Sequence, residues 1–179
     1  METLKLIKHT EGDDNCLNNV VNYPIGKDQV LKEGFGINPY DSKEAAYQFK
    51  EVAKFFNNQE STPVYHYMLS FTQETAPTAE RAMELTKEIF EPVIENHLTA
   101  IGVHYKEREG GNFHTHLAVS PTDLNDGSLM YGDNATNCPL ARRMAECTGQ
   151  PTEYVIRKED ETEVKYPEIF VPHADEDNG

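Results

Sequence analysis

Cysteines and long apolar runs are both scarce in this chain. Its three cysteines, Cys16, Cys138 and Cys147, are an odd number at spacings that fit neither a disulfide framework nor a paired-cysteine zinc site. No apolar run approaches the roughly 20 residues of a membrane span, and the first ten residues lack the apolar core of a signal peptide. We therefore expect reduced thiols, no membrane segment and a cytoplasmic location.

Basic residues are also in the minority. The chain has 16 Lys and Arg against 31 Asp and Glu, a formal net charge of -15. Such a charge favours solubility and repels polyanions, which weighs against nucleic-acid binding. The 179 residues match one domain with its own core. We expect this domain to span residues 1–172, with an acidic flexible tail at 173–179.

Apolar periodicity predicts a mixture of strands and helices. Expected strands lie at Leu4–Lys8, Gly34–Asn38, Val64–Phe71, Thr99–Lys106, Asn112–Ser120, Glu153–Arg157 and Val164–Val171. Expected helices lie at Asn15–Tyr23 (ended by Pro24, with Tyr23 extended), from Asp41 or Ser42 to Phe56, from Pro77 to about Pro92, and from about Pro139 to Cys147. The best strands are neighbours joined by a Gly110–Gly111 turn, which favours a hairpin. The fold class is therefore α+β, with a central antiparallel β-sheet flanked by helices.

Three histidines fall on this expected hairpin. Successive side chains of a strand point to opposite faces, so His114 and His116 share one face, about 6 to 7 Å apart. The turn brings the strand that carries His104 alongside them. Three neutral imidazoles suit Zn, Mn, Fe, Co, Ni or Cu and leave open positions for water or a phosphate oxygen. The pattern favours a catalytic metal site over three unrelated histidines.

The remaining histidines lie outside this motif, and other classes of protein with a His-x-His motif match the sequence less well. His9, His97 and His173 are interpreted as ordinary surface histidines. Ser120 and Pro121 follow the motif where a cupin would need a glutamate, and the third alternating histidine of histidine-triad hydrolases is absent. Two-histidine phosphoesterases would need paired His-x-Thr/Ser strands, which this motif does not supply.

Four segments, taken in order, resemble the relaxases of conjugative and mobilisable elements, especially MobP-type plasmid mobilisation nucleases of the HUH endonuclease superfamily. The segments run over about Asn15–Gly149 and are Leu17-Asn-Asn-Val-Val-Asn-Tyr23, Gly34-Phe-Gly-Ile-Asn-Pro39, Tyr65-His-Tyr-Met-Leu-Ser-Phe71, and Val103-His104 with His114-Thr-His116-Leu-Ala-Val. The resemblance implies a relaxase-like nicking domain with a central antiparallel sheet.

The resemblance also implies a reaction and its residues. The hydroxyl of Tyr23 would attack a phosphodiester of single-stranded DNA at an origin of transfer, giving a 5′-phosphotyrosyl intermediate. The histidines would hold a divalent ion, Mg²⁺ or Mn²⁺, with Zn²⁺ as the alternative. Contact with DNA, or support of the site, falls to Ser70, His66, Lys106 and Arg108, with Arg142 and Arg143 as further basic candidates. Relaxosome accessory proteins would be partners.

Two departures from the family pattern keep other functions open. His104-Tyr105-Lys106 stands where the family usually has His-Asp-Thr, and the net charge is acidic rather than basic. Both favour the alternative of a catalytically inactive, relaxase-like accessory or regulatory module that binds DNA or metal. A third hypothesis is a metal-dependent phosphoesterase on small substrates, for which an acidic surface is no handicap.

Overall fold

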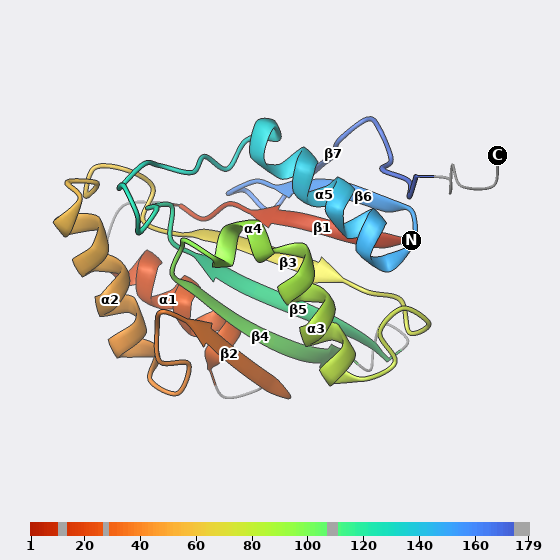
Figure 1. Cartoon of the computed structure of the whole chain (residues 1–179), viewed down its shortest axis with the longest axis horizontal. Helices are drawn as coiled ribbons and strands as arrows, with labels where there is room; N and C mark the ends of the chain where they lie inside the picture. Colours follow the sequence, from red (N-terminus) through yellow and green to blue (C-terminus); the bar gives the residue numbers. More distant parts are fainter. Residues whose placement is uncertain (11–13, 27–28, 107–110, 174–179) are drawn as a thin grey trace.

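A seven-stranded sheet organises the chain in the computed structural model, which describes residues 1–10, 14–26, 29–106 and 111–173. The strands are β1 (Glu2–Ile7), β2 (Leu31–Phe35), β3 (Tyr65–Ser70), β4 (Thr99–Lys106), β5 (Asn112–Val119), β6 (Thr152–Arg157) and β7 (Glu163–Lys165). The helices are α1 (Asp14–Ile25), α2 (Ser42–Phe55), α3 (Ala79–Ile89), α4 (Glu91–Ile94) and α5 (Asn134–Thr148). Figure 1 shows the sheet with α3, α4 and α5 in front of it and α1 behind it.

The order of strands across the sheet is β2-β4-β5-β3-β1-β6-β7. Every neighbouring pair is antiparallel except β1 and β6, which are parallel. The expected α+β fold is confirmed, and the sheet is mixed rather than purely antiparallel. The parallel pair requires a long connection, which the chain supplies through β2 to α5.

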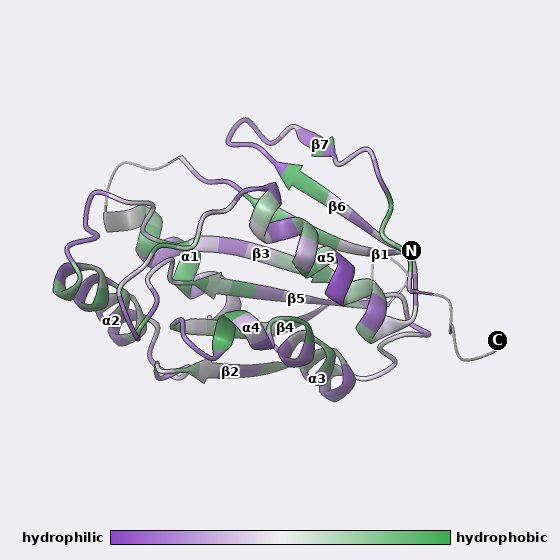
Figure 2. Ribbon diagram, turned by 45° about the horizontal axis from the view of Figure 1, so that its top comes forward, coloured by the Kyte–Doolittle hydropathy of each residue, from purple (hydrophilic) through white to green (hydrophobic). Residues whose placement is uncertain are grey.

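Two apolar clusters cover opposite faces of the sheet. The larger one buries Leu4, Tyr67 and Leu117 of the sheet beneath α3 and α5, and the smaller one packs Val21 of α1 and Phe49 of α2 together with Ala118 of the sheet. Figure 2 shows hydrophilic and hydrophobic segments alternating along α3 and α5, as expected for helices with one face on a core. Because α1 and α2 cover only part of their face, the other part stays open as a cleft.

Helix starts follow their capping residues. The Asp41 side chain accepts a hydrogen bond from the Glu44 backbone N–H, so α2 begins where the sequence predicted. The expected start of the last helix near Pro139 is wrong, because α5 begins at Asn134 behind the cap Asp133. Asn137, within that extra turn, is buried and bonds to two tyrosines of the core.

Among the helices of the described residues, none has the length and apolarity that a bilayer crossing requires.

The second strand also differs from its expected position. β2 ends at Phe35, whereas the sequence predicts a strand over Gly34–Asn38. Gly36 has a φ of 74°, in the left-handed region, and this turns the chain out of the sheet. The expected tail begins with His173 and otherwise lies outside the described residues.

Candidate active site

The hairpin of β4 and β5 places the three predicted histidines on one face of the sheet. His104 lies directly opposite His114, and Gly102 lies opposite His116. The alternate residues Thr115 and Leu117 face the large core, so the strand periodicity read from the sequence is correct. His114 and His116 are buried, and the rings of His104 and His116 lie 4.8 Å apart between centroids.

Tyr23 lies in the last turn of α1, above this histidine face. Its ring centroid is 4.5 Å from that of His116, 5.8 Å from that of His104 and 5.2 Å from that of His66. The side chain is 50 % exposed, so it borders both the imidazoles and solvent. The structure thus brings together Tyr23 and residues far away in the sequence, which spacing alone could not establish.

The expected effect of Pro24 on this region is wrong. Pro24 was expected to end the helix and extend Tyr23, but α1 continues to Ile25 with Pro24 inside it. Pro24 has no N–H to donate to the Val20 carbonyl, and the helix ends one residue after it, while buried Val21 and Ile25 hold this turn on the sheet. The fit also needs Gly102, because a Cβ there would lie 1.5 Å from the Pro24 carbonyl oxygen.

A series of hydrogen-bonded imidazoles runs from the surface to His116. The His66 Nε2 and His116 Nδ1 atoms are 2.8 Å apart, and so are His9 Nε2 and His66 Nδ1. The rings of His9 and His66 are stacked, with 4° between their planes. His9 is therefore not the ordinary surface histidine that the sequence suggested. No sequence pattern indicates the contact of His9 with His66, because His9 lies just beyond β1. Only the pairing of Ile7 with His66 brings it to the site.

Burial keeps these imidazoles neutral. Desolvation is the main cause that lowers the pKa of His66 to about 3, and the charge of His9 adds to it. Desolvation likewise lowers the pKa of His116 far below its usual value, with His66 and His104 as further causes. A neutral imidazole offers one nitrogen as a donor and the other as an acceptor. His66 therefore donates a hydrogen bond to one of its two neighbouring imidazoles and accepts one from the other.

Two polar side chains complete the surroundings of the histidines. The Ser70 hydroxyl lies 3.1 Å from His114 Nδ1, on the face where the sequence placed it. The Gln29 amide donates to the Tyr23 backbone oxygen over 2.6 Å and lies 3.4 Å from His104 Nε2. Gln29 thus links α1 to the histidines, and no motif in the sequence indicated it.

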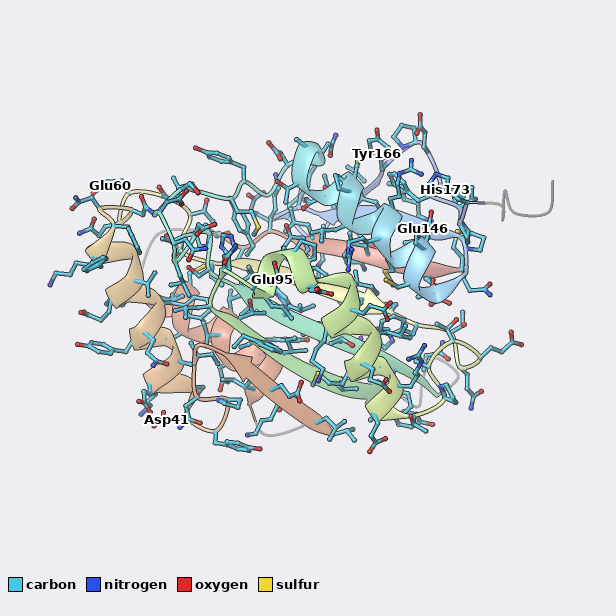
Figure 3. All side chains as sticks on the ribbon, in the orientation of Figure 1. Asp41, Glu60, Glu95, Glu146, Tyr166 and His173 are labelled. Carbon is cyan, nitrogen blue, oxygen red and sulfur yellow. The ribbon has the colours of Figure 1, made fainter. Side chains whose placement is uncertain are left out.

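The other histidines lie elsewhere. His97 was expected at the surface but is buried, with Nδ1 2.8 Å from the Ser120 carbonyl oxygen, so that expectation is wrong. His173 is exposed beside Glu146 of α5, as Figure 3 shows, and contacts its carboxylate. Neither belongs to the histidine face.

The basic candidates divide between the two faces. Lys106 is exposed and lines the open cleft, while Arg108 lies outside the described residues. Arg142 and Arg143 belong to α5, on the opposite face. Arg142 lies over the Phe170 ring, and Arg143 donates to the carbonyls of Glu88 and Ile89. The structure therefore does not bring these two arginines to the histidine cleft.

The histidines of the site are suitable metal ligands, but their side chains are not positioned around a common point. His104, His114 and His116 are imidazoles on one face, and the low pKa of His116 keeps it in the form that binds metals. Among the described residues, however, no three or more His, Cys, Asp or Glu side chains are grouped as a metal would require. The donor set fits a divalent ion, whereas its side chains do not form a coordination shell here.

A cleft of about 570 Å³ opens beside these residues, lined by Tyr23, His66, Ser70, His114 and His116 and continuing over β1 and β6. A mixed sheet with an open face, a tyrosine at a helix end and a histidine hairpin thus meet at one cleft.

The chain belongs to the relaxase family. It matches the family described as "Relaxase: MobA/VirD2-like, nuclease domain" over residues 20–148, which covers most of the chain. No curated protein matches the chain. Membership confirms the resemblance seen in the motifs and supports a relaxase-type DNA-nicking function on single-stranded DNA.

Proposed function

We propose that this protein nicks single-stranded DNA at an origin of transfer, with Tyr23 as nucleophile and a divalent ion held by His104, His114 and His116. The observation that carries the proposal is the position of the Tyr23 ring, 4.5 Å from that of His116 in an open cleft. Family membership supports the DNA substrate. Mg²⁺ or Mn²⁺ is the proposed ion.

The proposed reaction is a transesterification. The Tyr23 oxygen forms a bond to the scissile phosphorus, and the bond from phosphorus to the 3′-oxygen breaks. The products are a 5′-phosphotyrosyl link and a 3′-hydroxyl, which takes up a proton; the link keeps the strand available for rejoining. When bound, the metal would polarise the scissile phosphate as a Lewis acid.

The surrounding side chains have positioning roles in this proposal. Gln29 holds the backbone of Tyr23 next to His104, and Ser70 holds the ring of His114. His66 donates to or accepts from His116, and so fixes which nitrogen of His116 faces the site. Lys106 would contact a DNA phosphate at the cleft edge.

The test is a covalent-adduct assay. The whole chain would be incubated with Mn²⁺ or Mg²⁺ and single-stranded candidate origins, and the adduct resolved on a denaturing gel. We expect an adduct with the wild type, none with Tyr23→Phe, and an unchanged yield with Tyr131→Phe, another exposed tyrosine. An adduct that persists in Tyr23→Phe, or no adduct on any candidate origin, would contradict the proposal.

A binding module that does not nick is the second candidate. It is favoured by the histidine arrangement, which forms no metal cluster among the described residues, and by Tyr105 and Lys106 in place of the family's Asp and Thr. This function predicts that DNA binding survives in Tyr23→Phe and that no adduct forms with either protein.

A further inference from the structure

Basic side chains gather in one part of this acidic molecule. The described residues that line the open cleft include six basic and four acidic ones, whereas the whole chain has 16 basic and 31 acidic residues. The six are Lys5, Lys8, Lys106, Arg157, Lys158 and Lys165, and we name them the basic track. A polyanion repelled by the rest of the surface is attracted only where the sign of the charge reverses.

The strand register makes this track continuous with the histidine face. Reading directly paired residues across the sheet from the site, one row consists of His116, Met68, Lys5, Val155 and Lys165. Side chains in such a row share one face of the sheet. Four strand spacings separate His116 from Lys165, which is about 19 Å. The floor of the cleft therefore leads from below Tyr23 to the outer strand β7.

The floor and the rim of the cleft differ in character. Ile7, Met68 and Val155 are buried apolar floor residues, while Lys8, Lys158 and Lys165 project as exposed cations. A groove that combines a charged rim with an apolar base suits a single strand, whose phosphates and bases are both accessible. A double helix presents its phosphates outward and its bases inside, and so would use only the rim.

Three of these cations form ion pairs with carboxylates of the chain. Lys5 lies 2.6 Å from Glu163, Lys165 lies 3.3 Å from Glu153, and Arg157 lies 3.3 Å from Glu161. The side chains of Arg157 and Glu161 are 38 % and 80 % exposed, so solvent screens this pair most, whereas Lys5 is 17 % and Glu153 is 22 % exposed and their pairs are screened less. An exposed ion pair contributes about 0–1 kcal/mol, so a DNA phosphate can displace Glu161 from Arg157 at little cost.

We propose that the basic track over β1, β6 and β7 holds the single strand that extends from the scissile phosphate, and that Glu153, Glu161 and Glu163 weaken this binding by competing for its cations. The proposal rests on the proposed function, because it takes the substrate to be single-stranded DNA at Tyr23. It adds the direction in which the strand leaves the site and a reason for reversible binding.

The test uses matched pairs of variants. Lys165→Gln breaks the pair with Glu153 on the track, and Lys87→Gln, on α3, breaks a comparable pair with Glu33 of β2. Glu161→Gln frees Arg157, and Glu84→Gln frees Arg81 on α3. Within each pair the change in net charge is the same, so only the place differs. Anisotropy of a labelled oligothymidylate of about 16 nucleotides gives the affinity over a salt series.

We expect Lys165→Gln to bind severalfold more weakly than Lys87→Gln, with a salt slope reduced by about 0.7. Glu161→Gln should bind severalfold more tightly than Glu84→Gln. Equal affinities within each pair would overturn the track, and if the Tyr23 adduct still forms, the proposed function stands. Failure of the wild type both to bind the oligonucleotide and to form an adduct would overturn the proposed function and the track together. Track-dependent binding without an adduct would support the track and overturn nicking.

Discussion

At the scale of single residues, His66 has a position from which it can control the chemistry of His116. It is 3 % exposed and hydrogen-bonds to His9 on one side and to His116 on the other. A histidine that binds metal through Nε2 carries its proton on Nδ1 and donates it to a partner, often a carboxylate. In this chain the partner of His116 Nδ1 is an imidazole, although the family pattern offers an acidic residue beside His104.

The residue-scale prediction concerns His66→Ala. Loss of the partner of His116 should raise the Mn²⁺ concentration needed for half-maximal adduct formation by about 10- to 100-fold, since outer-shell partners of metal ligands contribute that much. His66→Gln keeps an acceptor oxygen and should recover part of the loss, which a merely structural role would not explain. The measurement is adduct yield against Mn²⁺ concentration.

His173→Ala is the matched control for this experiment. His173 also contacts another titratable side chain, Glu146, but it lies at the surface of α5. We expect its Mn²⁺ dependence to equal that of the wild type. The same Mn²⁺ dependence in His66→Ala as in the wild type would argue against a positioning role.

At the scale of elements, the approach of α1 to β4 determines where Tyr23 lies. A methyl group at Gly102 would overlap the Pro24 carbonyl oxygen, which is backbone and can move only with the helix end. Ala100 and Ala118 are fully buried on the same face, so small residues line the area where α1 packs. The position of Tyr23 thus depends on the absence of large side chains on the sheet where α1 packs.

The element-scale prediction is that Gly102→Ala lowers the rate of adduct formation by about 100-fold. The added Cβ must push the last turn of α1 outward, and a misplacement of about 1 Å at a reacting group costs that order of rate. Overpacking should also destabilise the protein by about 1–3 kcal/mol, measured by urea unfolding. Gly132→Ala, whose Cβ would meet the side chains of Tyr65 and Leu6, should destabilise without a comparable loss of rate. Equal rates in the two variants would contradict this account.

The sequence predicted local features of the fold and site better than contacts between distant segments. Local periodicity predicted the hairpin, the shared face of His104, His114 and His116, and the face of His66 and Ser70, because these depend on neighbours in one or two strands. The parallel pairing of β1 with β6 joins residues about 150 positions apart, and no local pattern encodes it. For the same reason the sequence predicted neither the contact of His9 with His66 nor the basic track.

At the scale of the whole molecule, the core and the site occupy opposite faces of one sheet. The larger apolar cluster lies beneath α3 and α5 and includes fully buried residues such as Leu69, Ile101 and Leu117. The histidines and Tyr23 lie on the other face, beside the smaller cluster. A domain of this size with a continuous core does not require a metal to fold, unlike small zinc domains.

The whole-molecule prediction follows from this separation. The protein dialysed against EDTA should stay folded and unfold cooperatively, but it should form no DNA adduct until Mn²⁺ or Mg²⁺ is restored. Because an ion that binds only the folded state stabilises it by mass action, Mn²⁺ at a hundredfold excess over its Kd should add about 2.7 kcal/mol. The melting temperature should therefore rise with Mn²⁺ in the wild type and in Tyr23→Phe, but not in His114→Ala. A melting temperature that rises equally in His114→Ala would place the ion elsewhere, and unfolding in EDTA would show that the metal supports the fold rather than the reaction.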